Sequence, residues 1–416
     1  MNKLVIRAVF IVILLYVCRQ SYLVISHEQI AGDDFRCYYT TAWMVRTHQS
    51  ASVYLASGDT DPTFDLNRVK PDTAFARTAA AHNIHFGGEV LPYTYPLTLA
   101  DLMVPLTFLS PSTAFLLWTL ASAAALFWAA VLMVRMPEMG LSGQLLPVLA
   151  FLLFRPTLDG FVWGQVVMLL FLSLVAGIML YLRGNTYAAA FLLALPMTIK
   201  LTPLILLVPL VAWRDWKMLR AVILWCVAIA AAVLMINGTS WIGLYVFHEL
   251  RTIGVKFDVG SRSIGTALQV LWTRTDRGIT LPILTTIGKL ISTVMVAYAA
   301  WQSRSDGAQS PTGRFKLESL AGFLLLSSCI SPVAWMHGYL AGAPALLIVG
   351  KRIWDEQGGT FESIVFLLLI CSLATNTMSA LMILTPVLTL VLVAMGFQRL
   401  RQPQNEVSRR LVPIGS

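Results

Sequence analysis

Long apolar runs dominate this chain of 416 residues and determine the solvent in which it folds. A helix needs about 20 mostly apolar residues to cross a bilayer, and the runs are continuous rather than alternating as in a membrane β-barrel. Hydrophobic residues make up 57% of the chain and charged residues only 12%. An average soluble domain carries about twice that charge. The sequence therefore predicts an all-α integral membrane protein.

About a dozen apolar segments can be drawn by this criterion. They lie at 4–25, 96–109, 113–134, 144–157, 164–182, 186–199, 201–213, 218–236, 280–301, 319–331, 336–350, 360–374 and 377–397. Several are shorter than a full span. Placing both ends of the chain in the cytoplasm requires an even number of full crossings, so one of these thirteen segments is expected to be re-entrant or merged with a neighbour. We expect roughly 12 transmembrane helices in a single domain over residues 1–397.

Basic residues gather in the short gaps between these segments, near residues 183, 214–220, 304–316, 351–352 and 399–410. Short basic loops face the cytoplasm in membrane proteins. The pattern predicts a multi-pass protein of the bacterial cytoplasmic (inner) membrane, with a basic cytoplasmic tail at 398–416. It also accounts for the net charge of +9 without nucleic acid as a partner.

The N-terminus and the cysteines carry no further processing or metal signal. Residues 1–24 place Lys3 and Arg7 before an apolar stretch, as a signal peptide does, but no small-residue cleavage site follows. We therefore expect an uncleaved first helix. The five cysteines form no C-x-x-C pair, so neither a disulfide framework nor a metal cluster is expected.

Two hydrophilic stretches, at about 27–95 and 237–280, alternate with the basic gaps and are expected outside the membrane. Asp33 and Asp34 lie where the first of them begins. A carboxylate beside hydrocarbon is costly, so this pair is the strongest functional candidate. Asp34 is interpreted as a general base that activates a hydroxyl. The alternative is an interfacial carboxylate that starts a loop or caps a helix.

Several short motifs follow one another along the chain. They are Asp34-Phe35-Arg36-Cys37-Tyr38-Tyr39, Tyr54, Tyr95-Pro96, Pro105-Leu106, Gly164-Gln165, Ile199-Lys200-Leu201-Thr202-Pro203 and Ser331-Pro332-Val333-Ala334-Trp335-Met336-His337. Their order and spacing, from about residue 30 to 345, resemble those of the polyprenyl-phosphate-dependent mannosyltransferases of glycosyltransferase family 87. The resemblance implies a GT-C-type bundle with a large first extracytoplasmic loop. It also implies that the catalytic aspartate is Asp34.

Three cationic or imidazole side chains are candidates for binding the donor phosphate. Lys200 lies between two apolar runs, where a charge costs about 2.5 kcal/mol or more, and Pro196 and Pro203 predict a helix break around it. Its alternative is a lysine that extends to the interface. Arg262 is suited to bidentate phosphate binding, or else is a solvated loop residue. His337 is either a phosphate ligand or a structural histidine.

Gln165, Arg36 and Tyr95 complete the expected substrate-binding set. Gln165 begins a long apolar helix and either binds sugar or phosphate or is a polar helix start. Arg36 belongs to the Asp34 motif. Tyr95 lies where the chain re-enters the membrane, where an aromatic belt residue is expected on physical grounds alone.

No metal site and no cofactor are expected. Asp59-Thr60-Asp61 has the D-x-D form of soluble sugar transferases but lacks partner ligands. His82 and His85 are spaced i, i+3 without a third ligand; a solvated loop is the simpler interpretation.

The expected function is that of an inverting glycosyltransferase at the outer face of the membrane. Its donor would be a polyprenyl-phosphate hexose, most simply the mannose that the resemblance implies. Its acceptor would be a hydroxyl of a glycan or glycolipid, deprotonated by Asp34, with membrane lipids around the bundle. The alternative is a transporter or flippase of a lipid-linked sugar, which would use the same cations without a base.

Overall fold

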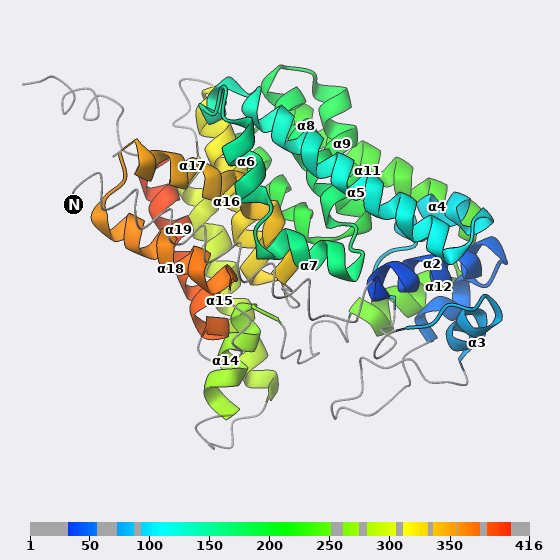
Figure 1. The fold of residues 1–416 in the computed structure, drawn as a ribbon. Helices are drawn as coiled ribbons and strands as arrows, with labels where there is room; N and C mark the ends of the chain where they lie inside the picture. The colour runs from blue at the N-terminus through cyan, green and yellow to red at the C-terminus, as the bar shows by residue number, and fades with distance from the viewer. Residues whose placement is uncertain are drawn as a thin grey trace, which may run out of the picture.

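A computed structural model describes residues 32–55, 73–86, 93–250, 261–273, 281–304, 311–331, 336–355, 357–374 and 381–400 (Figure 1). Across these ranges the secondary structure is helical and contains no strand, which confirms the all-α prediction. The expected first helix at 1–24 and most of the predicted basic tail lie outside the described residues.

The helices follow the predicted apolar segments closely. They are α4 (Thr98–Met103) with η2 (Val104–Phe108), α5 (Pro111–Val134), α6 (Leu145–Leu152), α7 (Arg155–Trp163), α8 (Val167–Leu182), α9 (Thr186–Ile199), η4 (Thr202–Leu206), α10 (Leu207–Ala212), α11 (Trp216–Asn237), α15 (Leu281–Gln302), α16 (Gly313–Ile330), η6 (Met336–Gly342), α17 (Ala343–Trp354), α18 (Thr360–Ala374) and α19 (Leu381–Leu400).

Capping residues explain several helix starts. The side chains of Ser110, Asn185, Asp215 and Thr312 each accept a hydrogen bond from a backbone N–H in the first turn of α5, α9, α11 and α16. Such caps satisfy donors that have no partner within the helix. The ends of these helices are therefore encoded locally, by polar residues between apolar runs.

Within the described residues, three helices are long and apolar enough to cross a membrane: α5, α11 and the Ile383–Leu400 part of α19. The pair α6 and α7, bent by 60°, would be a fourth if it forms one span. Helices α8, α9 and α18 are shorter and apolar. The architecture fits an integral membrane protein, whereas the expected count of twelve spans is not confirmed.

The helices pack as two neighbouring groups. In one, α8 packs between α5 and α9, and α9 packs on α11. In the other, α16 and α18 pack on α19 beside α14 (Ile264–Thr273) and α15. The 3-10 helix η6 contacts α8 of the first group and α16 of the second, so it joins the two groups.

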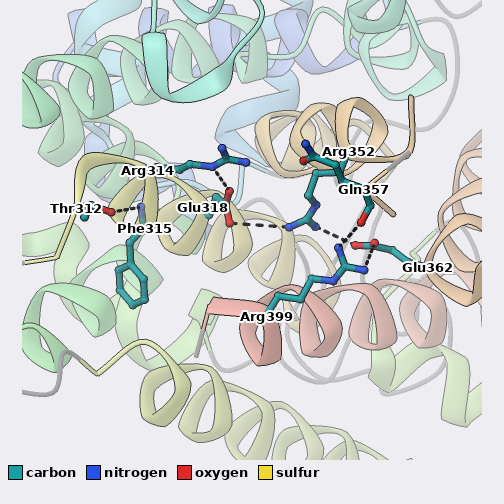
Figure 2. Close-up of polar contacts among 8 residues, drawn as sticks. All are labelled: Thr312, Arg314, Phe315, Glu318, Arg352, Gln357, Glu362 and Arg399. Carbon is teal, nitrogen blue, oxygen red and sulfur yellow. Dashed lines mark hydrogen bonds and ion pairs between the residues drawn. The ribbon is translucent and has the colours of Figure 1, made fainter. Parts of the chain in front are cut away.

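An ion-pair network ties α17 to α16, α18 and α19 of the second group (Figure 2). Glu362 of α18 is fully buried and pairs with Arg352 of α17 at 2.9 Å and with Arg399 of α19 at 2.7 Å. Arg352 also lies 3.9 Å from Glu318 of α16, which accepts a hydrogen bond from Arg314 at 2.9 Å. The network lies where the basic gaps were predicted to face the cytoplasm.

Short helices form within both predicted external loops. The first loop contains α2 (Asp33–Arg46), η1 (Ser50–Leu55) and α3 (Ala74–Ala81). The second contains α12 (Ser240–Gly243), η5 (Leu244–Glu249) and α14. Helix η1 contacts both α12 and η5, and the Tyr54 ring lies 5.2 Å from that of Tyr245. The α12–η5 part of the second loop therefore packs on the first loop, whereas α14 packs on α15 and α19 (Figure 1).

Candidate active site

The two acidic residues at the start of α2 have different surroundings. Asp33 accepts a hydrogen bond from the guanidinium of Arg36, one turn along the same helix, at 2.8 Å. Asp34 is buried and points instead toward the turn between α7 and α8, where it meets Gln165. Both acids lie in the first turn, where the helix dipole favours negative charge. These contacts direct Asp34 at another part of the chain.

Two glycines allow α2 and the α7–α8 turn to touch. The Gly32 N–H donates to the carbonyl of Val162 at 2.6 Å. Gly164 has a φ of +68°, and a Cβ there would lie 2.7 Å from the Cβ of Phe35 and 3.3 Å from the Cα of Gly32. Only glycine fits both that backbone conformation and that approach. The contact places the residue after Gly164 beside Asp34.

That residue is Gln165, which is fully buried. Its Nε2 donates a hydrogen bond to Oδ2 of Asp34. Its Oε1 accepts from the hydroxyl of Tyr38 at 2.9 Å and from that of Tyr95 at 3.4 Å. Four side chains from three segments, namely α2, the α7–α8 turn and the segment before α4, thus meet in one polar cluster.

The Asp34 carboxyl is tuned by this environment. Helix α2 is not among the apolar helices that could span a membrane. Burial raises the pKa of Asp34 from 3.8 to about 7, although the Gln165 hydrogen bond and the charge of Lys200 lower it and Asp33 raises it slightly further. Desolvation is the dominant cause. A carboxylate whose pKa lies near neutrality is matched to accepting a proton at physiological pH.

The helix break predicted around Lys200 is confirmed. Helix α9 ends at Ile199, Lys200 has extended backbone angles, and η4 begins at Thr202 with Pro203 in its first turn. The Nζ of Lys200 lies 5.8 Å from the ring centroid of Tyr95, within cation–π range. The break therefore directs this lysine toward the Asp34 cluster.

Lys200 also borders an open cavity, to which η6 contributes His337. One wall carries hydroxyl groups and the other is apolar. The polar lining includes Ser327, Ser328, Ser331 and Thr202, and the apolar lining includes Val167, Leu170, Phe171 and Leu174 of α8. Asp34 does not line this cavity itself. Lys200 and Tyr95 connect the cavity to the carboxylate.

Two other predicted ligands have structural partners. The Arg262 guanidinium donates to the carbonyl of Ser372 and to Oγ1 of Thr385, at 3.0 Å for the latter, so it joins α18 and α19. Arg36 pairs with Asp33. Their roles in substrate binding stay predictions.

The sequence offered two possible groups of metal ligands, His82 with His85 and Asp59 with Asp61. His82 stacks on Trp43 with ring centroids 3.7 Å apart. Asp59 and Asp61 lie outside the described residues. Over the part of the chain that the structure describes, no group of three His, Cys, Asp or Glu side chains is placed to hold a metal ion.

The helical fold and the buried acid–amide–lysine cluster define a membrane protein with a candidate catalytic centre. The chain belongs to glycosyltransferase family 87, whose model matches residues 93–332. The matched region includes Tyr95, Gln165, Lys200 and Arg262, whereas Asp34, Arg36 and His337 lie outside it. The family resemblance predicted from the ordered motifs is thus confirmed.

A curated relative is the polyprenol-phosphate-mannose-dependent alpha-(1-2)-phosphatidylinositol pentamannoside mannosyltransferase of Mycolicibacterium smegmatis (strain ATCC 700084 / mc(2)155). The two chains are 27% identical over 274 residues, which cover 62% of this chain and 60% of the relative. The chain thus matches less than two thirds of that relative's length. No solved structure matches it significantly.

Proposed function

We propose that this protein transfers mannose from a polyprenyl-phosphate donor to an acceptor hydroxyl at the outer face of the cytoplasmic membrane, with inversion at the anomeric carbon. The observation that carries the proposal is the position of Asp34, a buried carboxylate oriented by Gln165 and near Lys200. Membership of family 87 and the name of the mycolicibacterial relative support the donor.

In the proposed reaction Asp34 takes the proton of the acceptor hydroxyl. The acceptor oxygen bonds to the anomeric carbon as the bond from that carbon to the phosphate oxygen breaks. Polyprenyl phosphate leaves with the electron pair, so a single displacement inverts the configuration. A positioned general base contributes typically about 10²–10⁴-fold to the rate.

The leaving phosphate needs positive charge and hydrogen-bond donors placed before the reaction. We assign this role to Lys200 and His337, which line the same cavity with several hydroxyl groups. Arg262 is a further candidate for this role. The apolar α8 wall of the cavity suits the first isoprene units of the lipid, so the prenyl chain can stay in hydrocarbon while its phosphate reaches Lys200. Arg36 and Tyr95 would contact the sugars near Asp34.

We propose a GT-C-type bundle in which the first external loop presents Asp34. Helix η1 of that loop, on which α2 and α3 pack, contacts α12 and η5 of the second loop. We assign this end of the bundle to the outside, as the positive-inside pattern predicts. The name of the relative specifies a phosphatidylinositol mannoside. A glycolipid with free mannose hydroxyls is therefore the acceptor that we propose.

The proposal can be tested with the purified full chain in lipid nanodiscs, supplied with polyprenyl-phosphate-mannose and a panel of glycolipid, polysaccharide and peptide acceptors. Asp34→Asn should lower transfer by about 10²–10⁴-fold. Asp33→Asn, which alters the neighbouring carboxylate, should retain most of the activity.

Full activity in Asp34→Asn would show that another group is the base. The transporter alternative predicts a different result: the intact lipid-linked sugar would move between the leaflets of vesicles and no mannose would reach any acceptor. The acceptor panel also separates a glycolipid from a polysaccharide or a protein.

A further inference from the structure

We infer that Gln165 is a positioning residue, which holds Asp34 in its reactive orientation through the amide N–H, and that Tyr38 and Tyr95 fix the direction of that amide. The sequence predicted that Gln165 binds the sugar or phosphate of the substrate, whereas the inference gives it a role in positioning Asp34. Its kinetic consequence rests on the proposed function. The contact between Gln165 and Asp34 can also be measured without any substrate.

The direction of the amide follows from what each partner can offer. An ionised carboxylate only accepts hydrogen bonds, whereas a glutamine carries a donor end and an acceptor end. With Nε2 toward Asp34, Oε1 receives the hydroxyls of Tyr38 and Tyr95 at 2.9 and 3.4 Å. The flipped amide would set its oxygen against the carboxylate and lose both phenol donors as partners. The two tyrosines thus favour the arrangement in which an N–H faces Asp34.

This arrangement affects which form of Asp34 is stable. A hydrogen bond to the charged form of a carboxyl favours ionisation, whereas burial opposes it. Among the described residues, the other titratable or charged groups around this carboxyl are Asp33, Cys37 and Tyr38 on its own helix, Tyr95 before α4, and Lys200 at the end of α9. Because Oδ2 is bound to Gln165, we assign Oδ1 to the acceptor proton.

The contact is tested with Gln165→Met, which has a similar volume and no N–H. Its control is Gln302→Met, since Gln302 is also a buried glutamine but belongs to the far end of α15. Tyr38→Phe removes one phenol of the cluster. Its control is Tyr39→Phe, the neighbouring tyrosine, whose hydroxyl donates to the carbonyl of Leu109 at 2.7 Å.

The first readout is the infrared band of the protonated Asp34 carboxyl, isolated by subtracting the spectrum of Asp34→Asn in the matching background and followed against pH. Gln165→Met should move the midpoint of this titration upward by about one pH unit. Tyr38→Phe should move it in the same direction by less. Both control variants should leave it unchanged.

The second readout is the pH profile of kcat/KM for mannose transfer. A midpoint that rises by about one unit from neutrality lowers the ionised fraction at pH 7 from about a half to about a tenth, so kcat/KM at that pH falls roughly fivefold. The ratio of variant to wild-type kcat/KM, measured at the same pH, should return most of the way to one at pH 9, which a merely structural defect would not do.

The inference is overturned if Gln165→Met lowers activity while both midpoints stay in place. The same conclusion follows if the infrared midpoint of Gln165→Met matches that of Gln302→Met. A wild-type protein that transfers no mannose would refute the proposed function instead, and the infrared titration would still decide whether Gln165 controls Asp34.

Discussion

Replacing Gly164 by alanine tests whether the close contact between α2 and the α7–α8 turn builds the site. An alanine at a left-handed position costs about 1–2 kcal/mol for the backbone alone. At Gly164 the new Cβ would also lie 2.7 Å from the Cβ of Phe35 and 3.1 Å from the ring of Phe115. Overpacking of this kind costs about 1–3 kcal/mol more. We therefore expect Gly164→Ala to lower the free energy of unfolding by about 2–5 kcal/mol.

Gly184→Ala is the matched control. Gly184 has a φ of +80°, and a Cβ there would meet no atom within 4 Å, so this variant should lose only the backbone part, about 1–2 kcal/mol. Thermal unfolding of both variants in the same detergent compares their losses of stability. Mannose-transfer rates of the two variants show how far each change disturbs the candidate active site.

Gly164→Ala should also lower kcat in its folded fraction, because pushing α2 away separates Asp34 from Gln165. A misplacement of about 1 Å in a catalytic group can cost about 10²-fold in rate, whereas Gly184→Ala should keep the wild-type rate. If the two variants matched each other in both stability and transfer, the reasoning from the glycine contact would be wrong.

Two further changes address the cavity and the ion-pair network. Lys200→Met should lower kcat/KM by about 10²–10³-fold through loss of the phosphate-stabilising charge. The control Lys217→Met, at the exposed start of α11, should leave kcat/KM unchanged. If the two variants transfer mannose at the same rate, Lys200 has no part in the mechanism. Glu362→Gln should destabilise the protein by about 1–3 kcal/mol, which is less than the loss of a fully buried pair would cost because Arg399 is partly exposed. The control Asp355→Asn, which breaks an exposed pair, should cost at most about 1 kcal/mol. Equal unfolding temperatures for these two variants would show that the network adds no stability.

Much of the fold could be predicted from the sequence because its signals are local. Apolar runs between polar gaps located most helices within a few residues, and the prolines around Lys200 located a real break. The predicted external loops, in contrast, contain packed helices. Their partners are distant in sequence, as with η1 and α12, so hydropathy carries no signal for these contacts.

The site was predictable only in part, for the same reason. The motif around Asp34 separated it from Asp33, and the structure shows Asp33 paired with Arg36. Gln165 was a predicted ligand of sugar or phosphate, yet its N–H meets Asp34. That contact depends on Gly32 and Gly164, which touch although more than a hundred residues separate them. Tyr38 gained its place in the cluster through the same long-range packing.

The central claim is that Asp34 accepts the acceptor proton, and the pH dependence of transfer tests it most directly. The base works only when ionised, so the burial that raises its pKa to about 7 should make kcat/KM rise with pH through neutrality. The stability of the protein should change with pH in the opposite direction. The pKa of Asp34 is higher in the folded state than in the unfolded chain, so the stability that the protonated carboxyl contributes is lost as the pH rises to about 7.

The decisive measurement is therefore kcat/KM for mannose transfer from pH 5 to 9, in the wild type and in Asp34→Asn. The account expects the rise of kcat/KM in the wild type to have its midpoint near pH 7. It expects Asp34→Asn to be lower by about 10²–10⁴-fold above that midpoint and to lack that rise. An Asp34→Asn enzyme that keeps both the rate and the rise with pH would contradict the account.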